Sequence, residues 1–253
     1  MTLSSPFNDL KILRRDSIFS NISHNKIVTV ITFFAILPLV NRSVSQKLDL
    51  FFGKFAPVYF RKGEVILRAD DVPSGVFYLK KGYVRDYTTS AQGEELTLII
   101  FKPDDIFPIQ WVINQKPSEH YFETLTPVEI WKAPREQFVK FLKNNPDVFE
   151  ELTSRIVIRL GGLLTRMKQL AFGNAFTKVV SILQLCAERF GKKEKGEIII
   201  QVPLTHEEIA SLVGIKRETA SRELKKLELE GLITHRDHLI VVKNLERLGG
   251  ELR

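Results

Sequence analysis

The spacing of hydrophobic residues changes along the chain and predicts two kinds of structure. Between residues 55 and 133, short apolar runs rich in β-branched and aromatic residues alternate with turn residues, which is typical of strands. The runs are VYFRKGEVILR, GVFYLKKGYVRDYTT, EELTLIIFK and PVEIWKA. Four glycines occupy positions at which we expect turns with positive φ, namely Gly63, Gly75, Gly82 and Gly93. This stretch therefore predicts an antiparallel β-roll or barrel without a helix of any length.

After Pro134 the period changes from two to 3.6, which predicts a short helix, REQFVKFLK, and then a long one over residues 146–172. Along the long helix, apolar residues follow spacings of 4, 3, 4 and 3 at Ile156, Leu160, Leu163, Met167 and Leu170. Such a seam is typical of a helix that packs on a partner helix, here in a dimer, although a core helix within one chain is the alternative. Gly161 and Gly162 cost about 1 kcal/mol each in a helix, so we expect a close helix approach or a kink there.

From residue 173 onward the pattern predicts a compact helical unit that ends in a strand pair. FGNAFTKVVSILQLCAERFG reads as a helix closed by Gly191, followed by a loop with Lys192, Lys193 and Lys195. A strand, EIIIQVPL, comes next. Thr205 and Glu208 then have the spacing of a capping box, which predicts the start of another helix.

Two helices joined by a glycine turn are predicted over LTHEEIASLVGIKRETASRELKKLELEGLI, the pattern of a helix-turn-helix. The first helix would turn Ile209, Ala210, Leu212 and Val213 inward, the turn would lie at Gly214, and the second helix would span about 217–230. At about 100° per residue, Ala220, Leu224 and Leu227 share the buried side of the second helix. The strands LITHR and HLIVVKN that follow would form a wing that turns at residues 236–238.

The opposite side of the second helix is polar. Arg217, Glu218, Ser221 and Arg222 occupy it, as expected of a recognition helix in the major groove of double-stranded DNA. Arginine can bond guanine O6 and N7, and glutamate can accept from a cytosine amino group. The surrounding residues that we expect to contact phosphates are Thr205, Lys216, Lys225 and Arg236. The alternative is a solvated helix face, in which Glu218 and Arg222 form an i, i+4 pair.

Composition sets further limits. The 253 residues include 44% hydrophobic ones and carry a net charge of +7, which permits an acidic partner such as nucleic acid or an anionic membrane. A single cysteine, Cys186, excludes an intrachain disulfide and a four-cysteine iron-sulfur cluster. Its apolar surroundings, VVSILQLCAERF, predict a buried thiol.

One segment raises the question of a membrane. Residues 27–40, IVTVITFFAILPLV, are 14 uncharged residues, fewer than the roughly 20 that a spanning helix needs. Basic residues before the segment and small residues after it are also compatible with a signal peptide. The simpler interpretation is a helix or strand packed on the domain that follows, so we expect a cytoplasmic protein without stable membrane association.

Catalytic and metal sites are not indicated. The chain has no phosphate-binding G-x-x-x-x-G-K-[ST] loop, no G-x-S-x-G elbow and no H-E-x-x-H pair. HRD at residues 235–237 is not followed by the asparagine of a kinase catalytic loop. His235 and His238 lack further metal ligands nearby in the sequence. We therefore expect no enzyme and no metal site.

The combination of β-roll, long helix and winged helix-turn-helix resembles the superfamily of the cyclic-AMP receptor protein and the fumarate and nitrate reduction regulator. The resemblance covers residues 46 to about 250 and is most specific in RETASR, residues 217–222, which is similar to the family's Arg-Glu-Thr-x-x-Arg helix. The glycines of KGEVI, SGVFYL, KGYVR and QGEEL add to it.

The resemblance implies an α+β fold and a homodimeric transcription factor. The expected domains are an N-terminal extension (1–45), a β-roll sensor domain (46–134), a dimerisation region (135–172) and a winged helix-turn-helix (173–253). By the resemblance, Arg217, Glu218 and Arg222 read bases, with Ser221 as a fourth candidate. Family members bind inverted repeats with half-sites about one helical turn apart, and RNA polymerase is a possible partner.

Three departures from the family pattern stand out. Lys216 replaces the usual Ser or Thr helix cap, which predicts a weaker cap and a lysine available to a phosphate. Asp70-Asp71 and Asp104-Asp105 stand where the family commonly has Gly-Asp, so we expect differently built turns there. Residues 1–45 extend beyond the usual start of the family.

The ligand of the roll is not indicated by the sequence. Cyclic-nucleotide members hold the ribose and phosphate with a Gly-Glu pair and an Arg-Ser pair. Here no arginine occurs between Arg85 and Arg135, and Phe107-Pro108-Ile109 stands where Gly-Glu would be, so we do not expect cyclic AMP. Haem ligation by His120 is not expected either. Aromatic residues, among them Phe107, Trp111, Tyr121 and Phe122, form either an effector pocket or the core of the roll.

Two hypotheses follow. The first is a DNA-binding regulator that acts as a homodimer on an inverted-repeat operator, with an unknown effector. The alternative is a membrane-attached or ligand-sensing β-roll protein, whose C-terminal unit serves only for protein interaction.

Overall fold

The computed structural model describes residues 42–252. The apolar segment 27–40 and most of the predicted N-terminal extension lie outside the described residues. Within the described part, no helix is long and apolar enough to cross a bilayer. The description that follows concerns this part of the chain.

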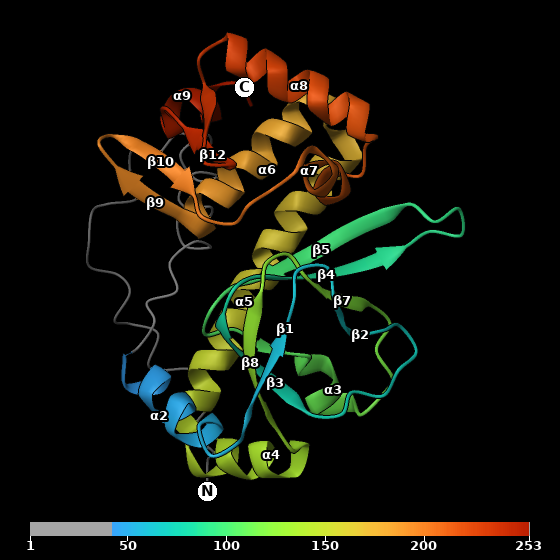
Figure 1. Ribbon diagram of the computed structural model, residues 1–253, viewed down its shortest axis with the longest axis vertical. Helices are drawn as coiled ribbons and strands as arrows, with labels where there is room; N and C mark the ends of the chain where they lie inside the picture. The colour runs from blue at the N-terminus through green and yellow to red at the C-terminus, as the bar shows by residue number, and fades with distance from the viewer. Residues whose placement is uncertain (1–41, 253) are drawn as a thin grey trace, which may run out of the picture. The chain divides into compact units, whose positions relative to one another are not determined.

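Residues 57–133 form the predicted antiparallel roll, which consists of two four-stranded sheets with the orders β1-β8-β3-β6 and β2-β7-β4-β5 (Figure 1). The strands are β1 (Pro57–Phe60), β2 (Val65–Leu67), β3 (Val76–Lys81), β4 (Val84–Thr89), β5 (Glu95–Phe101), β6 (Ile106–Phe107), β7 (Tyr121–Thr124) and β8 (Val128–Ala133). The sequence pattern missed β6 and β7, and the expectation of no helix was wrong because α3 spans Ile109–Asn114. These three elements are short, and an apolar run of two to six residues does not distinguish a strand from a helix.

Aromatic side chains fill the space between the two sheets. Phe107 and Phe122 stack with ring centroids 5.3 Å apart, and Phe101 lies 4.9 Å from Phe107. Leu79 and Ile130 complete this cluster from β3 and β8 and are fully buried. The inner faces of the strands therefore pack against one another as a continuous hydrophobic core.

The predicted glycine turns are correct at three of the four positions. Gly63, Gly82 and Gly93 have φ values of 81°, 85° and 81°. Gly75 does not have positive φ, and its role is a close approach to β8. A Cβ atom at this position would lie 2.8 Å from Cγ of Lys132 and 2.9 Å from the carbonyl oxygen of Ala133.

The two Asp-Asp turns adopt the conformation that glycine favours. Asp70 and Asp104 have φ values of 66° and 72°, in the left-handed region that aspartate tolerates better than most residues. The carboxylate of Asp104 accepts a hydrogen bond of 2.8 Å from the hydroxyl of Tyr78. These turns therefore keep, without glycine, the backbone conformation that glycine favours. The sequence had predicted turns built differently from those of the family.

Three helices pack beside the roll: α2 (Arg42–Phe52), α4 (Arg135–Asn144) and α5 (Pro146–Phe172). The bounds of α4 and α5 agree with the predicted helices. The predicted domain boundary after residue 45 falls inside α2, because this helix is part of the packed body. Its Val44, Leu48 and Phe52 are fully buried together with Phe138 and Val148.

The C-terminal unit contains α6 (Ala175–Phe190), β9 (Gly191–Glu194), β10 (Glu197–Ile200), α7 (His206–Val213), α8 (Arg217–Leu229), β11 (Ile233–Arg236), β12 (Leu239–Val242) and α9 (Leu245–Gly250). Its sheet has the order β11-β12-β10-β9. The expectation of a loop after Gly191 was wrong, because Lys192 and Lys193 lie in β9 and pair with Ile199 and Ile198. Gly191 begins this strand with φ −79°, and a Cβ there would lie 1.9 Å from the carbonyl oxygen of Ala187.

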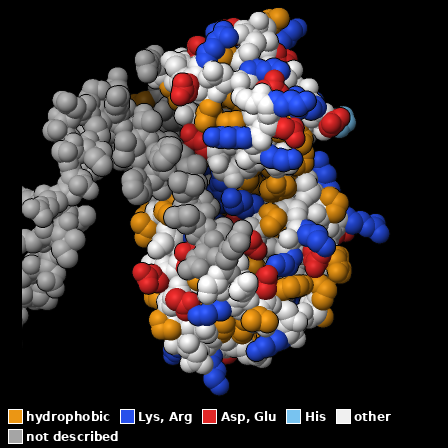
Figure 2. All heavy atoms as spheres, turned by 90° about the vertical axis from the view of Figure 1, so that its left-hand side faces the viewer, with side chains coloured by type: hydrophobic (Ala, Val, Ile, Leu, Met, Phe, Trp, Pro, Cys, Tyr) orange, Lys and Arg blue, Asp and Glu red, His pale blue; other side chains and the backbone are white. Residues whose placement is uncertain are grey.

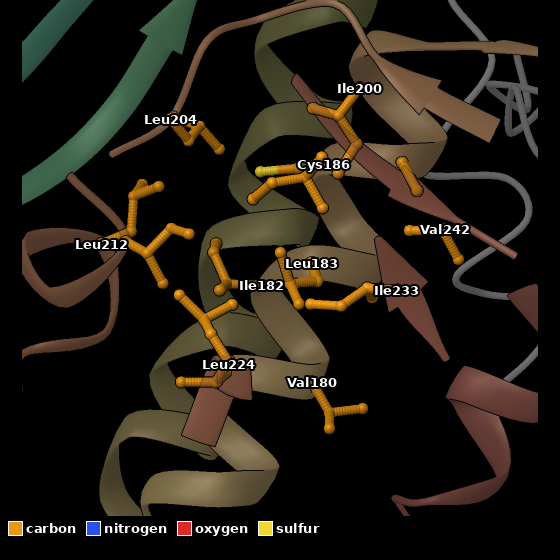
Figure 3. Close-up of a cluster of buried hydrophobic side chains, with 14 of the residues drawn as sticks. Val180, Ile182, Leu183, Cys186, Ile200, Leu204, Leu212, Leu224, Ile233 and Val242 are labelled. Carbon is orange, nitrogen blue, oxygen red and sulfur yellow. The ribbon is translucent and has the colours of Figure 1, made fainter. Parts of the chain in front are cut away.

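The core of the C-terminal unit is built from one side of α6 and the inner faces of its neighbours. Figure 3 shows Leu183 and Cys186 of α6 pointing toward side chains of α7, α8 and the sheet. Cys186 is 1% exposed, and burial raises the pKa of its thiol to about 12. The predicted buried thiol is therefore confirmed.

Candidate nucleic-acid interface

Helix α7 begins with the predicted capping box. The Thr205 hydroxyl accepts a bond of 3.2 Å from the Glu208 backbone N–H, and the Glu208 carboxylate accepts from the Thr205 backbone N–H. The helix ends at Gly214, which has φ 61° and reverses the chain direction. Ile209 and Val213 are buried, as predicted, so the position of α7 is set by its cap, its turn and its apolar side.

Helix α8 packs against the core of the C-terminal unit with the side that the sequence predicts to be buried. Ala220, Leu224 and Leu227 are at most 1% exposed and belong to the core of the C-terminal unit, in which Figure 3 labels Leu224. Since these three residues hold one side of the helix, the opposite side faces outward. The outward residues are Arg217, Glu218, Arg222 and Lys225, which are exposed, and Ser221, which is half-buried.

The two arginines of this outward side form only weak ion pairs. Nε of Arg217 lies 4.0 Å from a carboxylate oxygen of Glu207, and its side chain is 66% exposed. Nε of Arg222 lies 3.4 Å from Glu223, and its side chain is 72% exposed. Such exposed pairs contribute about 0–1 kcal/mol, so a nucleic acid can replace these partners at little cost. In the described residues the carboxylate paired with Arg222 is that of Glu223, not Glu218.

Lys216 precedes α8 and makes no side-chain hydrogen bond to its first turn. This agrees with the expectation of a weak cap at a position where Ser or Thr would accept from a backbone N–H. The lysine side chain is exposed. Its ammonium group is therefore free to meet an anion near the start of α8, where the helix dipole also favours negative charge.

The wing is the hairpin of β11 and β12, whose turn residues Asp237 and His238 have φ values of 49° and 65°. Arg236, a predicted phosphate contact, lies 2.8 Å from Glu197 and 3.5 Å from Glu194. It is about half exposed, so it stays near the surface while being oriented by the neighbouring strands.

Nδ1 of His235 lies 2.6 Å from a carboxylate oxygen of Glu228. No group of three or more possible metal ligands occurs among residues 42–252.

The predicted seam residues of α5 differ in how far they are exposed. Ile156, Leu160 and Met167 belong to an exposed apolar stripe, and Leu160 is 55% exposed. Leu163 and Leu170 are half-buried and lie beside this stripe. The other exposed apolar residues of the helix are Phe149, Val157, Leu164 and Phe172.

The helix runs without interruption through Gly161 and Gly162. Apart from the adjacent residues and the nearby backbone of α5 itself, no heavy atom of the described residues lies within 4 Å of a Cβ built on either glycine. The close approach expected at these glycines therefore does not come from another described element of the same chain. The space beside them remains available to a second helix.

The four aromatic residues proposed for an effector pocket do not lie together. Phe107 and Phe122 belong to the core between the sheets of the roll. Trp111 packs on the other cluster, which includes α2 and α4 residues. Tyr121 stacks on Tyr87 with ring centroids 5.2 Å apart. The sequence left open whether these aromatic residues line an effector pocket or form the core of the roll. Phe107 and Phe122 form part of the core.

Sequence reasoning missed the residues that join the roll to α7. Arg166 of α5 donates hydrogen bonds to the backbone carbonyls of Thr97 and Leu98 in β5 and of Leu212 in α7. The Thr97 backbone N–H donates to the Ser211 hydroxyl at 3.0 Å, and the two hydroxyls lie 2.8 Å apart. Thr97 and Ser211 are 114 residues apart, so no local pattern signals this contact.

Basic and acidic side chains are intermixed on the molecular face drawn in Figure 2. This face is therefore not a uniformly positive surface. Binding to an anionic polymer depends in such a case on particular side chains rather than on the mean charge of the surface.

Two family models match the chain. A model described as a cyclic nucleotide-binding domain matches residues 57–145, which correspond to the roll and α4. A model described as a Crp-like helix-turn-helix domain matches residues 177–250, which correspond to most of the C-terminal unit. Together the two matches span the roll and the candidate interface.

Curated relatives and solved structures agree with these matches. The chain is 26% identical over 197 residues to a CRP-like cAMP-activated global transcriptional regulator of Mycobacterium tuberculosis, covering 78% of this chain and 88% of that protein. It is 29% identical over 193 residues to a global nitrogen regulator of Synechocystis, covering 73% and 83%. A CooA variant from Carboxydothermus hydrogenoformans has a similar fold, with a TM-score of 0.68, 22% identity and coverage of 80% and 89%.

Proposed function

The chain belongs to the CRP/FNR superfamily of transcriptional regulators, and we propose that it binds an inverted-repeat operator as a homodimer through α8. One observation carries this proposal. The first two turns of α8 present exposed guanidinium and carboxylate groups, while Ala220, Leu224 and Leu227 hold the opposite side in the core. The match to a Crp-like helix-turn-helix disfavours the alternative, in which this unit serves only for protein interaction.

In the proposed complex, Arg217 and Arg222 donate to guanine O6 and N7, and Glu218 accepts from a cytosine amino group. Ser221 lies on the same side and is a fourth candidate for a base contact. Each correct bidentate pair adds about 1–3 kcal/mol of discrimination between bases. The weak ion pairs of both arginines support this role, because the guanidinium groups do not need to leave strong partners.

Contacts with phosphates orient the protein without reading the sequence. We assign them to Lys216, Lys225, Thr205 and Arg236, which lie at the start of α8, on its outward side, at the start of α7 and in the wing. Arg236 exchanges its two carboxylate partners for a phosphate in this proposal. Thr205 contributes its hydroxyl proton, because its oxygen already accepts from Glu208.

Dimerisation uses the exposed apolar stripe of α5, which two copies of the chain cover by packing their helices together. Ile156, Leu160 and Met167 are the central residues of this contact. The twofold axis then places two α8 helices on half-sites about 34 Å apart, one turn of DNA. We further propose a cytoplasmic location and RNA polymerase as a partner at the promoter.

We propose that this regulator does not respond to cyclic AMP through its roll. Arg85, the last arginine before Arg135, lies 2.6 Å from Glu95 and 3.1 Å from Glu123, so its charge is already compensated. The side chain of Phe107 is fully buried where the family pattern places a ligand-binding Gly-Glu pair. Neither an iron-sulfur cluster nor another cofactor is part of the proposal.

Selection from a random duplex pool with the purified full chain tests the proposed function. We expect a palindrome with half-sites about one helical turn apart. We also expect that 1 mM cyclic AMP leaves the affinity for this palindrome unchanged, although this concentration is roughly a thousandfold above a micromolar dissociation constant. Arg222→Ala should lose about 1–3 kcal/mol on the selected site and far less on random duplex.

Arg61→Gln is the control, because it removes an exposed charge of the roll. Recovery of no common sequence, or equal losses by Arg222→Ala on both duplexes, contradicts base reading by α8. Tighter binding with cyclic AMP contradicts only the proposal for the roll.

A further inference from the structure

Cationic side chains from three elements converge near the loop between β5 and β6. Lys102 and Asp105 belong to this loop, Arg155 and Arg159 lie one turn apart on α5, and Arg189 lies near the end of α6. The Asp105 side chain is 7% exposed and accepts hydrogen bonds from Arg159 and, at 3.4 Å, from Arg189. Its second oxygen also accepts a bond of 3.0 Å from the Lys102 backbone N–H.

The positive charges of this cluster exceed the negative ones. Among the five residues named above, four are cations, of which Arg159 and Arg189 contact Asp105. Glu151, whose oxygen lies 2.9 Å from Nε of Arg155, is a second carboxylate in contact with them. Four minus two leaves two positive charges in excess. The ammonium group of Lys102 does not contact either carboxylate and instead donates to the backbone carbonyl of Arg189 at 3.2 Å.

One guanidinium nitrogen of the cluster is buried without a partner. Nη1 of Arg155 donates to the backbone carbonyl of Asp104 at 3.1 Å, but Nη2 has no hydrogen-bond partner within residues 42–252. The Arg155 side chain is only 11% exposed. Leaving a buried charged donor unsatisfied is costly, so buried donors of this kind normally have an acceptor.

Burial and the neighbouring cations lower the pKa of two members of the cluster. Burial and the nearby Arg189 lower the pKa of Lys102, and Arg159 and Arg155 lower it further. Burial is also the main cause that lowers the pKa of Arg189, against the opposing effect of Asp105. A bound anion would raise both pKa values through its negative charge, in opposition to burial.

We propose that this cluster binds a small anion with two negative charges, a dicarboxylate or a phosphate, through Lys102, Arg155, Arg159 and Arg189. Arginine suits such a ligand because its planar fork donates two parallel bonds to a carboxylate or phosphate. Nη2 of Arg155 supplies a donor that no acceptor among residues 42–252 uses. Arg159 and Arg189 are 20% and 25% exposed, so the ligand can reach them from solvent.

The site has a regulatory consequence that rests on the proposed function. The anion competes with Asp105 for Arg159 and Arg189. Asp105 belongs to the roll and Arg189 to the C-terminal unit, so their ion pair joins the two parts directly. When the anion is bound, Arg189 contacts the anion instead, and the two parts are joined through the ligand. The anion thereby changes the affinity for the operator.

Isothermal titration calorimetry of the full chain tests the binding step without DNA. The probes are inorganic phosphate and succinate, with chloride at matched ionic strength as the reference. We expect saturable binding of at least one probe, and the comparison of the two identifies the ligand chemistry. Arg155→Gln should weaken this binding roughly tenfold or more, as expected for loss of a charged hydrogen bond.

Asp105→Asn provides a readout in the opposite direction, because it removes the competing carboxylate. It should tighten binding several-fold and increase the thermal stabilisation by the anion, which damage to the fold would not do. Arg61→Gln, which removes one exposed charge elsewhere, should bind as the unmodified chain does.

Heats equal to those with chloride overturn the proposal, as do equal losses in Arg155→Gln and Arg61→Gln. Anion binding that persists while no operator can be selected refutes the proposed function alone. Operator binding without anion binding refutes this inference alone.

Discussion

At the scale of the residue, burial decides the chemistry of several groups that the sequence presents as ordinary. Glu188 of α6 is half-buried, and its carboxylate lies 3.4 Å from the amide nitrogen of Gln184. Burial raises the pKa of this carboxyl group from 4.5 to about 7. The charged form is therefore disfavoured in the folded chain at the pH at which most carboxylates are ionised.

This raised pKa predicts a pH-dependent stability. The folded chain keeps the Glu188 proton up to about pH 7, whereas the unfolded chain releases it near 4.5. The stabilisation by this group is therefore complete below pH 4.5 and is lost as the pH rises through 7. Glu188→Gln should raise the free energy of unfolding at pH 8 by about 1 kcal/mol, after allowance for solvent screening.

Denaturant unfolding at pH 4.5 and pH 8 measures this effect. Glu94→Gln, a substitution of an exposed carboxylate in the turn after β4, is the control and should change stability little at either pH. A gain in Glu188→Gln of the same size at both pH values would show that deprotonation of Glu188 is not its cause.

Single residues also show where periodicity succeeds. Ala220, Leu224 and Leu227 follow the helical period and are all buried, because one flat side of α8 meets a continuous core. Leu163 and Leu170 follow a heptad just as well, yet they lie beside the exposed stripe of α5. One side of α5 packs against the roll and α6, and the other side carries the exposed apolar stripe. The spacing of the apolar residues alone does not show which residues are covered within one chain.

At the scale of the element, α7 is held from two directions. Its capping box and turn come from its own sequence, whereas β5 reaches it through Thr97 and Arg166. The guanidinium group of Arg166 donates to carbonyls of both elements, and burial lowers its pKa to about 10. The three hydrogen bonds offset part of the cost of burying this charge, while Nε of Arg166 has no hydrogen-bond partner within residues 42–252.

Arg166→Gln should release β5 and α7 together. The loss of hydrogen bonds from a charged donor lowers the free energy of unfolding by about 1.5–3 kcal/mol. Native-state hydrogen exchange should become faster in both elements, while exchange in β3 and β8 changes only as far as global stability does. Faster exchange confined to one of the two elements would contradict the coupling, and Arg61→Gln is again the matched loss of charge.

At the scale of the whole molecule, the proposed dimer explains an apolar stripe that one chain leaves uncovered. Exposed apolar residues that recur along one side of α5 are costly in a monomer but ordinary in a helix pair. Gly161 and Gly162 lie along the same helix with open space beside them, which suits a close approach of a partner backbone.

Leu160→Asp should abolish the dimer and leave the fold of each chain intact. The side chain is 55% exposed, so the aspartate is solvated in the monomer but would be buried in the pair. Sedimentation velocity should show the monomer, and operator affinity should fall by roughly a hundredfold or more because the two half-sites are no longer bound together. Val72→Asp, at an exposed apolar position of the roll, should remain dimeric. A dimeric Leu160→Asp protein would place the interface elsewhere.

The sequence by itself determined the roll, the long helix and the helix-turn-helix, together with the buried side of α8 and the capping box of α7. These features depend on periodicity or on residues three or four positions apart, which the local chain expresses directly. Only the tertiary structure decided that Lys192 and Lys193 enter a strand and that Arg166 joins β5 to α7. It alone also placed Asp105 in contact with Arg159 and Arg189, which are 54 and 84 residues away in the sequence. The physical reason is that contacts over such separations depend on how completed elements pack, and each element's own pattern is compatible with more than one packing.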